Sequence, residues 1–161
     1  MVGLVADDSP KVLKYRRAEF STRLPLHYRY SPTHWWVEPT GDRQYRAGIS
    51  KFSTRMLGEM VEFGFEIAPE SEIKPGTIIG WLEGFKAISD IYSVAMGRFL
   101  ARNEGLDNDA SLINRDPYRR GWIYHFEGDL DGNFLDVNDY AALLDKTIDK
   151  ILEQQKTDEI N

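Results

Sequence analysis

The sequence predicts a mainly β protein, a small antiparallel sandwich or barrel to which helices are added. Short runs of aromatic and β-branched residues recur along the chain, and turn signals such as Ser31-Pro32 and Lys74-Pro75-Gly76 separate them. From Asp136 onward, the apolar residues instead recur at helical spacing. Many short strands with closely spaced turns are typical of small sandwiches and barrels.

The expected strands follow from alternation and from aromatic content. Residues 61–67 alternate apolar and polar side chains with a period of two, which is the pattern of a half-buried strand. Further strands are expected where aromatic or β-branched runs lie between turn signals, at residues 27–30, 35–37, 45–49, 77–82, 88–95, 98–101 and 121–126. Residues 103–118 are rich in Asn, Asp and Pro and are expected to be loop.

Two helices are expected. Phe52, Met56 and Met60 recur every four residues, which predicts one short internal helix over residues 52–60. Near the end of the chain an amphipathic helix is predicted from six apolar positions, Tyr140, Leu143, Leu144, Ile148, Ile151 and Leu152. Asp136 or Asn138 can cap its first turn. The polar residues 154–161 are expected to fray.

Charge and composition divide the chain into three parts. Residues 1–30 carry six Lys or Arg and three Asp or Glu, a net of +3, whereas the remainder carries 14 and 23, a net of −9. We expect an N-terminal extension over residues 1–25, one folded domain over residues 26–154 that includes the C-terminal helix, and a polar tail over residues 155–161. The basic residues 11–17 are compatible with a short helix, but the periodicity spans too few residues to decide.

Composition also limits the possible functions. The chain has no cysteine, so its own residues cannot supply thiol catalysis, iron–sulfur ligation or a cysteine-based zinc site. No run approaches the roughly 20 apolar residues of a transmembrane helix, and no basic segment precedes the apolar N-terminus. We therefore expect a cytoplasmic protein that does not enter membranes. Its acidic body argues against nucleic-acid binding and is compatible with docking to basic patches on partner proteins.

The sequence offers no constellation for catalysis by the chain itself. No nucleophile–histidine–acid grouping and no glycine-rich phosphate loop can be identified. His27, His34 and His125 are scattered and lack the spacing of metal ligands, so no metal site is expected. His34, beside Trp35 and Trp36, is expected to be a half-buried histidine with a hydrogen-bond partner rather than a ligand or a base.

Lys86 lies at the centre of the most informative segment, residues 80–92. Two apolar runs flank a short polar centre, which is the pattern of a tight β-hairpin. A lysine at such a tip projects its stem into solvent, and by itself this would be an ordinary solubilising residue. Gly84 is expected to supply a positive φ for the turn.

The residues around this tip resemble the lipoyl-lysine motif of glycine-cleavage H proteins. The motif reads Glu83-x-x-Lys86-Ala87-x-Ser89-Asp90-x-Tyr92, with Gly97 eleven residues after the lysine. Other family positions keep their order and spacing, at Tyr30, His34, Trp36-Val37, Gly48-Ile49, Leu57-Gly58, Asn103-Glu104, Leu112-Ile113-Asn114, Asp116-Pro117-Tyr118 and Gly121-Trp122. The resemblance covers residues 27–152.

This resemblance implies a lipoyl-domain-like barrel-sandwich hybrid of two small antiparallel sheets, with a short internal helix and a C-terminal amphipathic helix. It also implies a lipoyl group amide-linked to Lys86, attached by a lipoate ligase or lipoyl transferase that reads Glu83 and Gly97. The chain would then be a non-catalytic carrier whose lipoyl group is a swinging arm. In the family, the arm takes an aminomethyl group from glycine decarboxylase to a tetrahydrofolate-dependent aminomethyltransferase, and dihydrolipoamide dehydrogenase reoxidises it. The family's loaded arm folds into a protective cleft.

The sequence departs from the family at several positions. Gly84-Phe85 precedes the lysine where H proteins usually have Ser-Val, and Val94 and Met96 replace Pro and a small residue. Three arginines replace acidic or small residues: Arg115, Arg119 and Arg120. The Glu-Gly-Phe-Lys-Ala form also resembles the lipoate-binding proteins of heterodisulfide-reductase-like sulfur oxidation, which are proposed to carry sulfane sulfur. The sequence leaves both assignments open, and we lean to the sulfur-oxidation complex, with the glycine-cleavage H protein as the alternative.

Two other functions are alternatives to a lipoyl carrier. Biotin carriers share the lysine at a hairpin tip but typically flank it with methionines, whereas Phe85 and Ala87 flank it here. An interaction module that keeps the fold without the cofactor would need no modification of Lys86.

Overall fold

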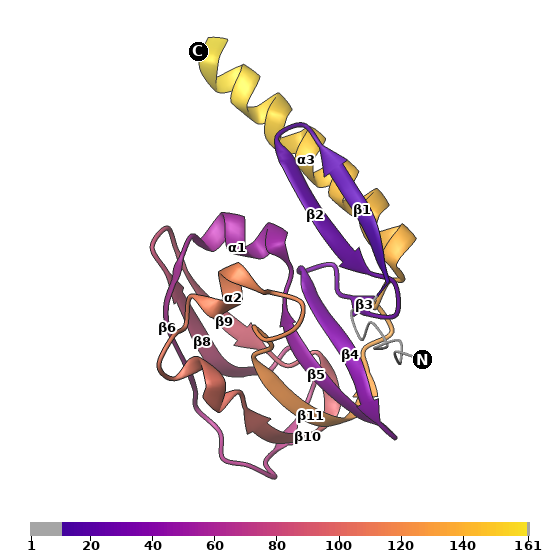
Figure 1. The fold of residues 1–161 in the computed structure, drawn as a ribbon, viewed down its shortest axis with the longest axis vertical. Helices are drawn as coiled ribbons and strands as arrows, with labels where there is room; N and C mark the ends of the chain where they lie inside the picture. Colours follow the sequence, from indigo (N-terminus) through magenta and orange to yellow (C-terminus); the bar gives the residue numbers. More distant parts are fainter. Residues whose placement is uncertain (1–10, 161) are drawn as a thin grey trace, which may run out of the picture.

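The computed structural model describes residues 11–160 and has the expected mainly β fold (Figure 1). A six-stranded antiparallel sheet forms one layer, in the order β3 (Arg29–Tyr30), β4 (Trp35–Gly41), β5 (Gln44–Ile49), β11 (Tyr124–Leu130), β10 (Ala95–Arg102) and β7 (Glu72–Ile73). A three-stranded antiparallel sheet forms the other layer, in the order β6 (Met60–Phe65), β8 (Ile78–Gly84) and β9 (Ile88–Tyr92). This is the barrel-sandwich arrangement that the resemblance implies.

The main hydrophobic core lies between these two sheets, because alternate residues of each strand face inward. Leu82 and Ile91 come from the smaller sheet, and Val37, Phe99 and Phe126 come from the larger one. All five side chains are buried. The core fixes the register of β8 and β9, and therefore the position of the turn that joins them.

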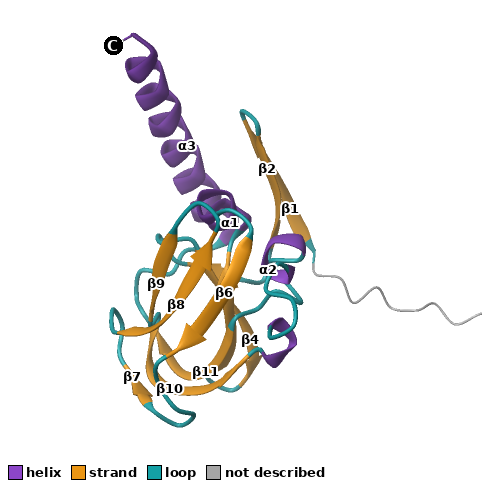
Figure 2. Cartoon of the chain, turned by 90° about the vertical axis from the view of Figure 1, so that its left-hand side faces the viewer, coloured by secondary structure: helices purple, strands orange, loops and turns teal. Residues whose placement is uncertain are grey.

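Short helices lie at one end and along one side of the sandwich (Figure 2). The expected internal helix is α1 (Lys51–Leu57), which ends at Gly58. The segment expected to be loop contains two short helices, η1 (Glu104–Leu106) and α2 (Leu112–Arg115). Leu106 and Ile113 from these helices are buried in the main core, which explains why this polar stretch is ordered.

The N-terminal segment is a β-hairpin, not a helix. Strands β1 (Val12–Arg17) and β2 (Phe20–Pro25) pair antiparallel, with Tyr15 opposite Thr22. Figure 1 shows this hairpin beside the long C-terminal helix α3 (Val137–Ile160). The hydroxyl of Tyr15 donates a hydrogen bond of 2.7 Å to Asp145 on α3. The strands form because α3 offers an apolar surface for one face of the hairpin, which the basic sequence alone does not indicate.

A second hydrophobic cluster joins this hairpin to the sandwich. Phe20 and Leu24 of the hairpin pack with Tyr30, Trp36 and the inner face of α3, and all are buried. Its other buried members are Tyr15, Tyr28, Phe52, Tyr118, Val137, Tyr140, Leu144 and Ile148. Residues 12–25 are therefore packed against the folded body.

Helix α3 begins as the sequence predicts. The carboxylate of Asp136 accepts a hydrogen bond of 2.8 Å from the amide of Asp139, so Asp136 is the N-terminal cap. The helix continues through the polar segment expected to fray and ends at Ile160. From Glu153 to Glu159 the side chains are exposed, so this last part of the helix has no packing partner among the described residues.

His34 is half-buried between α1 and α3, as predicted, and has a hydrogen-bond partner. Its Nδ1 lies 2.8 Å from the hydroxyl of Tyr140, and its ring packs 4.5 Å from that of Phe52, measured between centroids. Burial lowers the pKa of His34 from 6.5 to about 4 because the charged imidazolium loses its hydration. His34 is therefore neutral at pH 7.

This burial predicts a loss of stability in mild acid. Between pH 6.5 and 4 the unfolded chain binds a proton at His34 that the folded chain does not, so stability falls as the pH falls through this range. We expect the free energy of unfolding to decrease by up to roughly 3 kcal/mol from this group. His34→Asn keeps a polar atom near Tyr140 and tolerates the positive φ of 72°. Urea titrations at several pH values should show a shallower pH dependence for this variant, and parallel curves would contradict the assignment.

Candidate functional site

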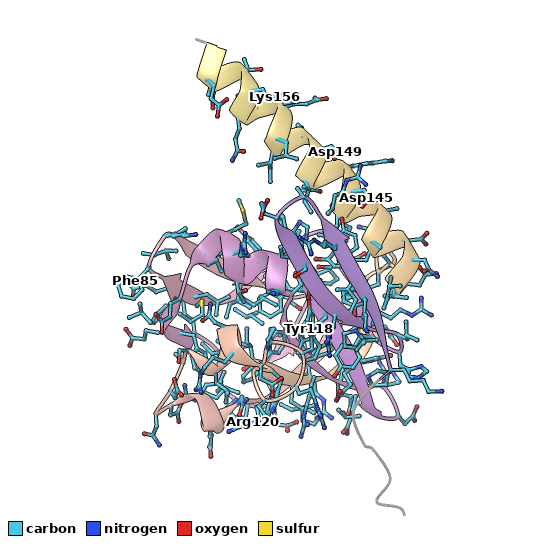
Figure 3. All side chains as sticks on the ribbon, turned by 45° about the horizontal axis from the view of Figure 1, so that its top comes forward. Phe85, Tyr118, Arg120, Asp145, Asp149 and Lys156 are labelled. Atoms are coloured by element: carbon cyan, nitrogen blue, oxygen red, sulfur yellow. The ribbon has the colours of Figure 1, made fainter. Side chains whose placement is uncertain are left out.

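Lys86 lies at the tip of a two-residue turn between β8 and β9. The amide of Gly84 donates to the carbonyl of Ala87 at 2.9 Å, and this bond leaves only Phe85 and Lys86 in the turn. Both side chains are exposed, and that of Phe85 is 79% accessible. Figure 3 shows Phe85 at the edge of the molecule. Nζ of Lys86 donates to the backbone carbonyl of Arg55 at 3.2 Å. Within residues 11–160 no ion pair includes this amine, so a modifying enzyme can reach it.

The backbone of the tip is fixed by two further hydrogen bonds. The amide of Lys86 donates to the carbonyl of Leu57 at 2.9 Å, and that of Phe85 donates to the carbonyl of Glu59 at 3.0 Å. These bonds join the turn to the segment that follows α1. The attachment point is therefore held on a rigid support, which is what a defined binding or transfer geometry requires.

Asn114 of α2 supports the same segment from the other side. Its side-chain oxygen accepts a hydrogen bond of 2.9 Å from the amide of Met60, and its Nδ2 donates to the carbonyl of Gly58 at 3.0 Å. Asn114 and Gly58 are among the positions that match the family, but the sequence gives no sign that they brace the lysine turn. Only the tertiary structure brings α2 beside the end of α1.

Two glycines allow this close packing. The expectation of a positive φ at Gly84 is wrong, because the positive φ angles lie at other glycines. Gly84 is required for a different reason, since a Cβ there would lie 2.2 Å from the carbonyl oxygen of Leu57. Gly58 does have a positive φ, of 80°, and a Cβ there would lie 3.0 Å from Cγ of Lys86. The two glycines leave space for the turn and for the lysine stem.

The predicted recognition residues Glu83 and Gly97 lie in different sheets. Glu83 is half-buried on β8, opposite Ile88 of β9, and shares the hairpin with Lys86. Gly97 is on β10, which follows β9 in the chain and begins after the end of β9 that is farthest from the tip. The five residues of β9 span roughly 16 Å at strand geometry, so the structure does not bring Gly97 next to Lys86.

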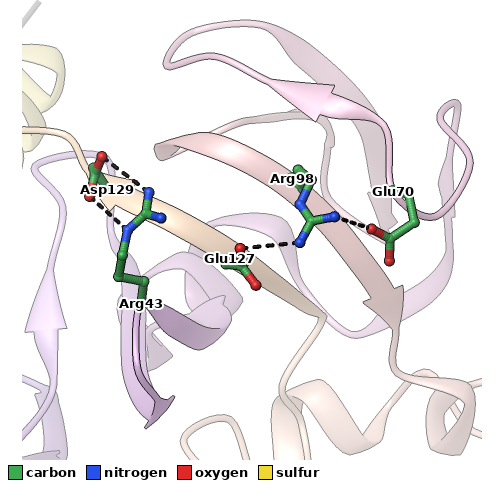
Figure 4. A network of polar contacts seen from close by, with 5 residues as sticks. All are labelled: Arg43, Glu70, Arg98, Glu127 and Asp129. Atoms are coloured by element: carbon green, nitrogen blue, oxygen red, sulfur yellow. Dashed lines mark hydrogen bonds and ion pairs between the residues drawn. The ribbon is translucent and has the colours of Figure 1, made fainter.

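Gly97 lies where two strands approach closely. It is paired with Gly128 on β11, and a Cβ at Gly97 would lie 1.9 Å from the carbonyl oxygen of Glu127. Exposed ion pairs surround this point (Figure 4), with Arg98 binding both Glu70 at 2.5 Å and Glu127 at 3.1 Å. The hydrogen bond from Arg98 lowers the pKa of Glu127. Gly97 therefore has a structural role in the pairing of β10 with β11.

A cleft of about 500 Å³ runs beside β9. The motif residues Ser89, Asp90 and Tyr92 line it, together with Ser31 and Trp35. The cleft therefore lies against the strand that follows the Lys86 turn. Its volume is in the range of pockets that hold small ligands.

Comparison with known proteins assigns the chain to a family. The family model described as glycine cleavage H-protein matches residues 28–147. The chain belongs to this family. The H protein of Idiomarina loihiensis is 36% identical over 131 residues, which cover 78% of this chain and 98% of that protein. The H protein of Mycobacteroides abscessus is 34% identical over 132 residues, which also cover 78% of this chain and 98% of that protein.

The fold of this H-protein family member agrees with a solved structure. The crystal structure of a glycine cleavage system H protein from Mycobacterium marinum has a TM-score of 0.67 and 27% sequence identity, and covers 74% of this chain and 97% of that chain. The matching family and these relatives favour glycine cleavage over sulfur oxidation, and none of them supports the sulfur-oxidation assignment favoured above. The hairpin β1–β2 precedes the residues that the family model matches.

Residues 11–160 contain neither a candidate membrane-spanning helix nor a candidate metal site. No helix there is long and apolar enough to cross a bilayer. No group of three or more His, Cys, Asp or Glu side chains in that range is placed to hold a metal ion.

Proposed function

We propose that this H-protein family member carries a lipoyl group amide-linked to Nζ of Lys86 and serves glycine cleavage as a non-catalytic carrier. The supporting observation is the exposed amine of Lys86 on a turn whose backbone is fixed by hydrogen bonds to residues 57 and 59. The proposal places the protein in the cytoplasm. Its partners are glycine decarboxylase, the tetrahydrofolate-dependent aminomethyltransferase and dihydrolipoamide dehydrogenase.

The residues around Lys86 fit an amide at this position. The only hydrogen bond of Nζ within residues 11–160 goes to the carbonyl of Arg55, and an amide N–H can donate to the same oxygen. No carboxylate there would be left without its partner when the charge is lost. Modification changes the formal net charge from −6 to −7, since one Lys charge is removed. When bound, the lipoyl group supplies the disulfide–dithiol chemistry that carries the transferred group.

The chain's own residues then act by positioning. Leu57 and Glu59 hold the turn, and Asn114 holds the segment that contains them. The cleft along β9 is the candidate resting place for the loaded arm, where the walls formed by Trp35 and Tyr92 would limit access of water. We further propose that the lipoate ligase or lipoyl transferase reads Glu83 and Gly97 together with Lys86.

Intact-mass measurement after co-expression with a lipoate ligase tests the attachment site. We expect one lipoyl increment on the wild type and on Lys74→Arg, an exposed control lysine in another turn, and none on Lys86→Arg. An unmodified wild type, under conditions that modify a known carrier, would contradict the proposal. The pathway is tested by supplying the lipoylated protein to glycine decarboxylase, where glycine–bicarbonate exchange is expected with the wild type and absent with Lys86→Arg.

A further inference from the structure

A basic cleft lies between the N-terminal hairpin and the surface formed by α1 and α2. Its volume is about 520 Å³. Cationic side chains from three separate parts of the chain line it: Lys14, Arg16, Arg23, Lys51 and Arg115. Tyr118 lies at the foot of the hairpin, and its hydroxyl is 2.8 Å from that of Thr22 in the same cleft (Figure 3). None of the described residues that line the cleft is Asp or Glu.

The hairpin places its cations on one face by simple alternation. Tyr15, Thr22 and Leu24 are buried, so Lys14, Arg16 and Arg23 on alternate positions are exposed. Pairing of the two strands sets Lys14 directly opposite Arg23. Like charges directly opposite each other destabilise an antiparallel pair, so this arrangement costs stability in the free protein.

Carboxylates do not neutralise most of this charge. Arg115 forms an ion pair with Asp109. In contrast, none of the ion pairs formed within residues 11–160 includes Lys14, Arg16, Arg23 or Lys51. The chain as a whole has a formal net charge of −6, so this group of cations is a positively charged region on an acidic protein. Clustered cations without partners create a local positive potential that attracts anions.

We infer that this cleft is a binding site for a small molecule with clustered phosphate groups. Guanidinium and ammonium groups are the side chains that bind phosphate most readily, and three of the five cations are arginines that can bind it through two hydrogen bonds. A cleft of this volume suits a small molecule rather than a flat macromolecular surface. The site is formed by the hairpin that precedes the family match and does not depend on lipoylation of Lys86.

Calorimetric titration of the full-length, unlipoylated protein with tripolyphosphate tests this site. We expect saturable binding that weakens as NaCl is raised, because four of the five cations are exposed. The double variant Lys14→Gln/Arg23→Gln should bind roughly tenfold more weakly, which corresponds to about 1.4 kcal/mol. The matched control Lys150→Gln/Lys156→Gln removes the same charge from the exposed face of α3 and should bind as the wild type does.

Two further measurements distinguish a specific phosphate site from general attraction of anions. Citrate, with three carboxylates, should bind more weakly than tripolyphosphate, and equal affinity would overturn the phosphate assignment. An equal loss of tripolyphosphate affinity in both double variants, or no saturable binding at low salt, would overturn the proposed site. The Lys14→Gln/Arg23→Gln variant should also unfold at a higher temperature without ligand, because it relieves the cross-strand repulsion. This rise shows that weaker binding is not caused by misfolding.

Discussion

Replacing Gly97 with alanine is expected to lower the free energy of unfolding by about 3 kcal/mol. The new Cβ would lie 1.9 Å from the carbonyl oxygen of Glu127 and 2.8 Å from its carbonyl carbon, and both belong to backbone of the paired strand β11. No flexible side chain can move aside, so the β10–β11 ladder must separate locally. Urea denaturation followed by circular dichroism measures the effect.

Gly132→Ala is the matched control for this prediction. Gly132 is exposed, and a Cβ there would meet nothing within 4 Å, so its stability should change by no more than about 0.5 kcal/mol. Comparing the two variants also distinguishes a steric role of Gly97 from a role in enzyme recognition. If Gly97→Ala is as stable as the wild type but is no longer lipoylated, the residue acts through enzyme recognition and the steric explanation is wrong.

The position of Lys86 on a hairpin tip could be predicted from the sequence, because the residues that indicate it are close together in the chain. Two apolar strands and a short polar centre, all within residues 80–92, are sufficient to place Lys86 on a hairpin tip. The hydrogen bonds that hold this tip could not be predicted, because Leu57, Glu59 and Asn114 are distant in the sequence and come close to it only in the folded protein. The error at Gly84 has the same origin, since the oxygen that excludes a side chain there belongs to Leu57.

The N-terminal hairpin shows where sequence signals fail. Its turn is formed by Ala18 and Glu19, and Ala18 has a φ of 52°. Tight hairpin turns with positive φ usually contain Gly, Asn or Asp, so this turn has no recognisable signature. A basic strand with few apolar residues also gives weak periodicity. Packing against α3 and against aromatic residues of the sandwich explains why residues 12–25 become ordered strands.

Strand β11 illustrates a related limit. The expected strand ended at residue 126, whereas the observed strand continues to Leu130. Glu127, Gly128 and Asp129 look like a polar turn in the sequence. In the fold, Glu127 and Asp129 face outward and pair with Arg98 and Arg43, which are distant in the chain (Figure 4). Polar residues can extend a strand when their partners come from neighbouring strands, and a single sequence does not show those partners.

Replacing Leu24 with alanine is expected to lower the free energy of unfolding by about 2 to 5 kcal/mol. Leu24 is completely buried in the cluster that joins the hairpin to α3 and to the outer face of the larger sheet. The substitution leaves a cavity among large rings, including those of Tyr30 and Trp36, which cannot close around it without losing their own packing. Chemical denaturation at neutral pH gives the measurement.

Leu26→Ala supplies the comparison two residues away. Leu26 is 40% exposed, so the same change of side chain should cost less than about 1 kcal/mol. A large difference between the two variants would establish that the hairpin belongs to the cooperative fold. Equal and small effects would mean that residues 12–25 separate from the body before it unfolds. In that case the basic cleft would open with them, because the hairpin forms one of its walls.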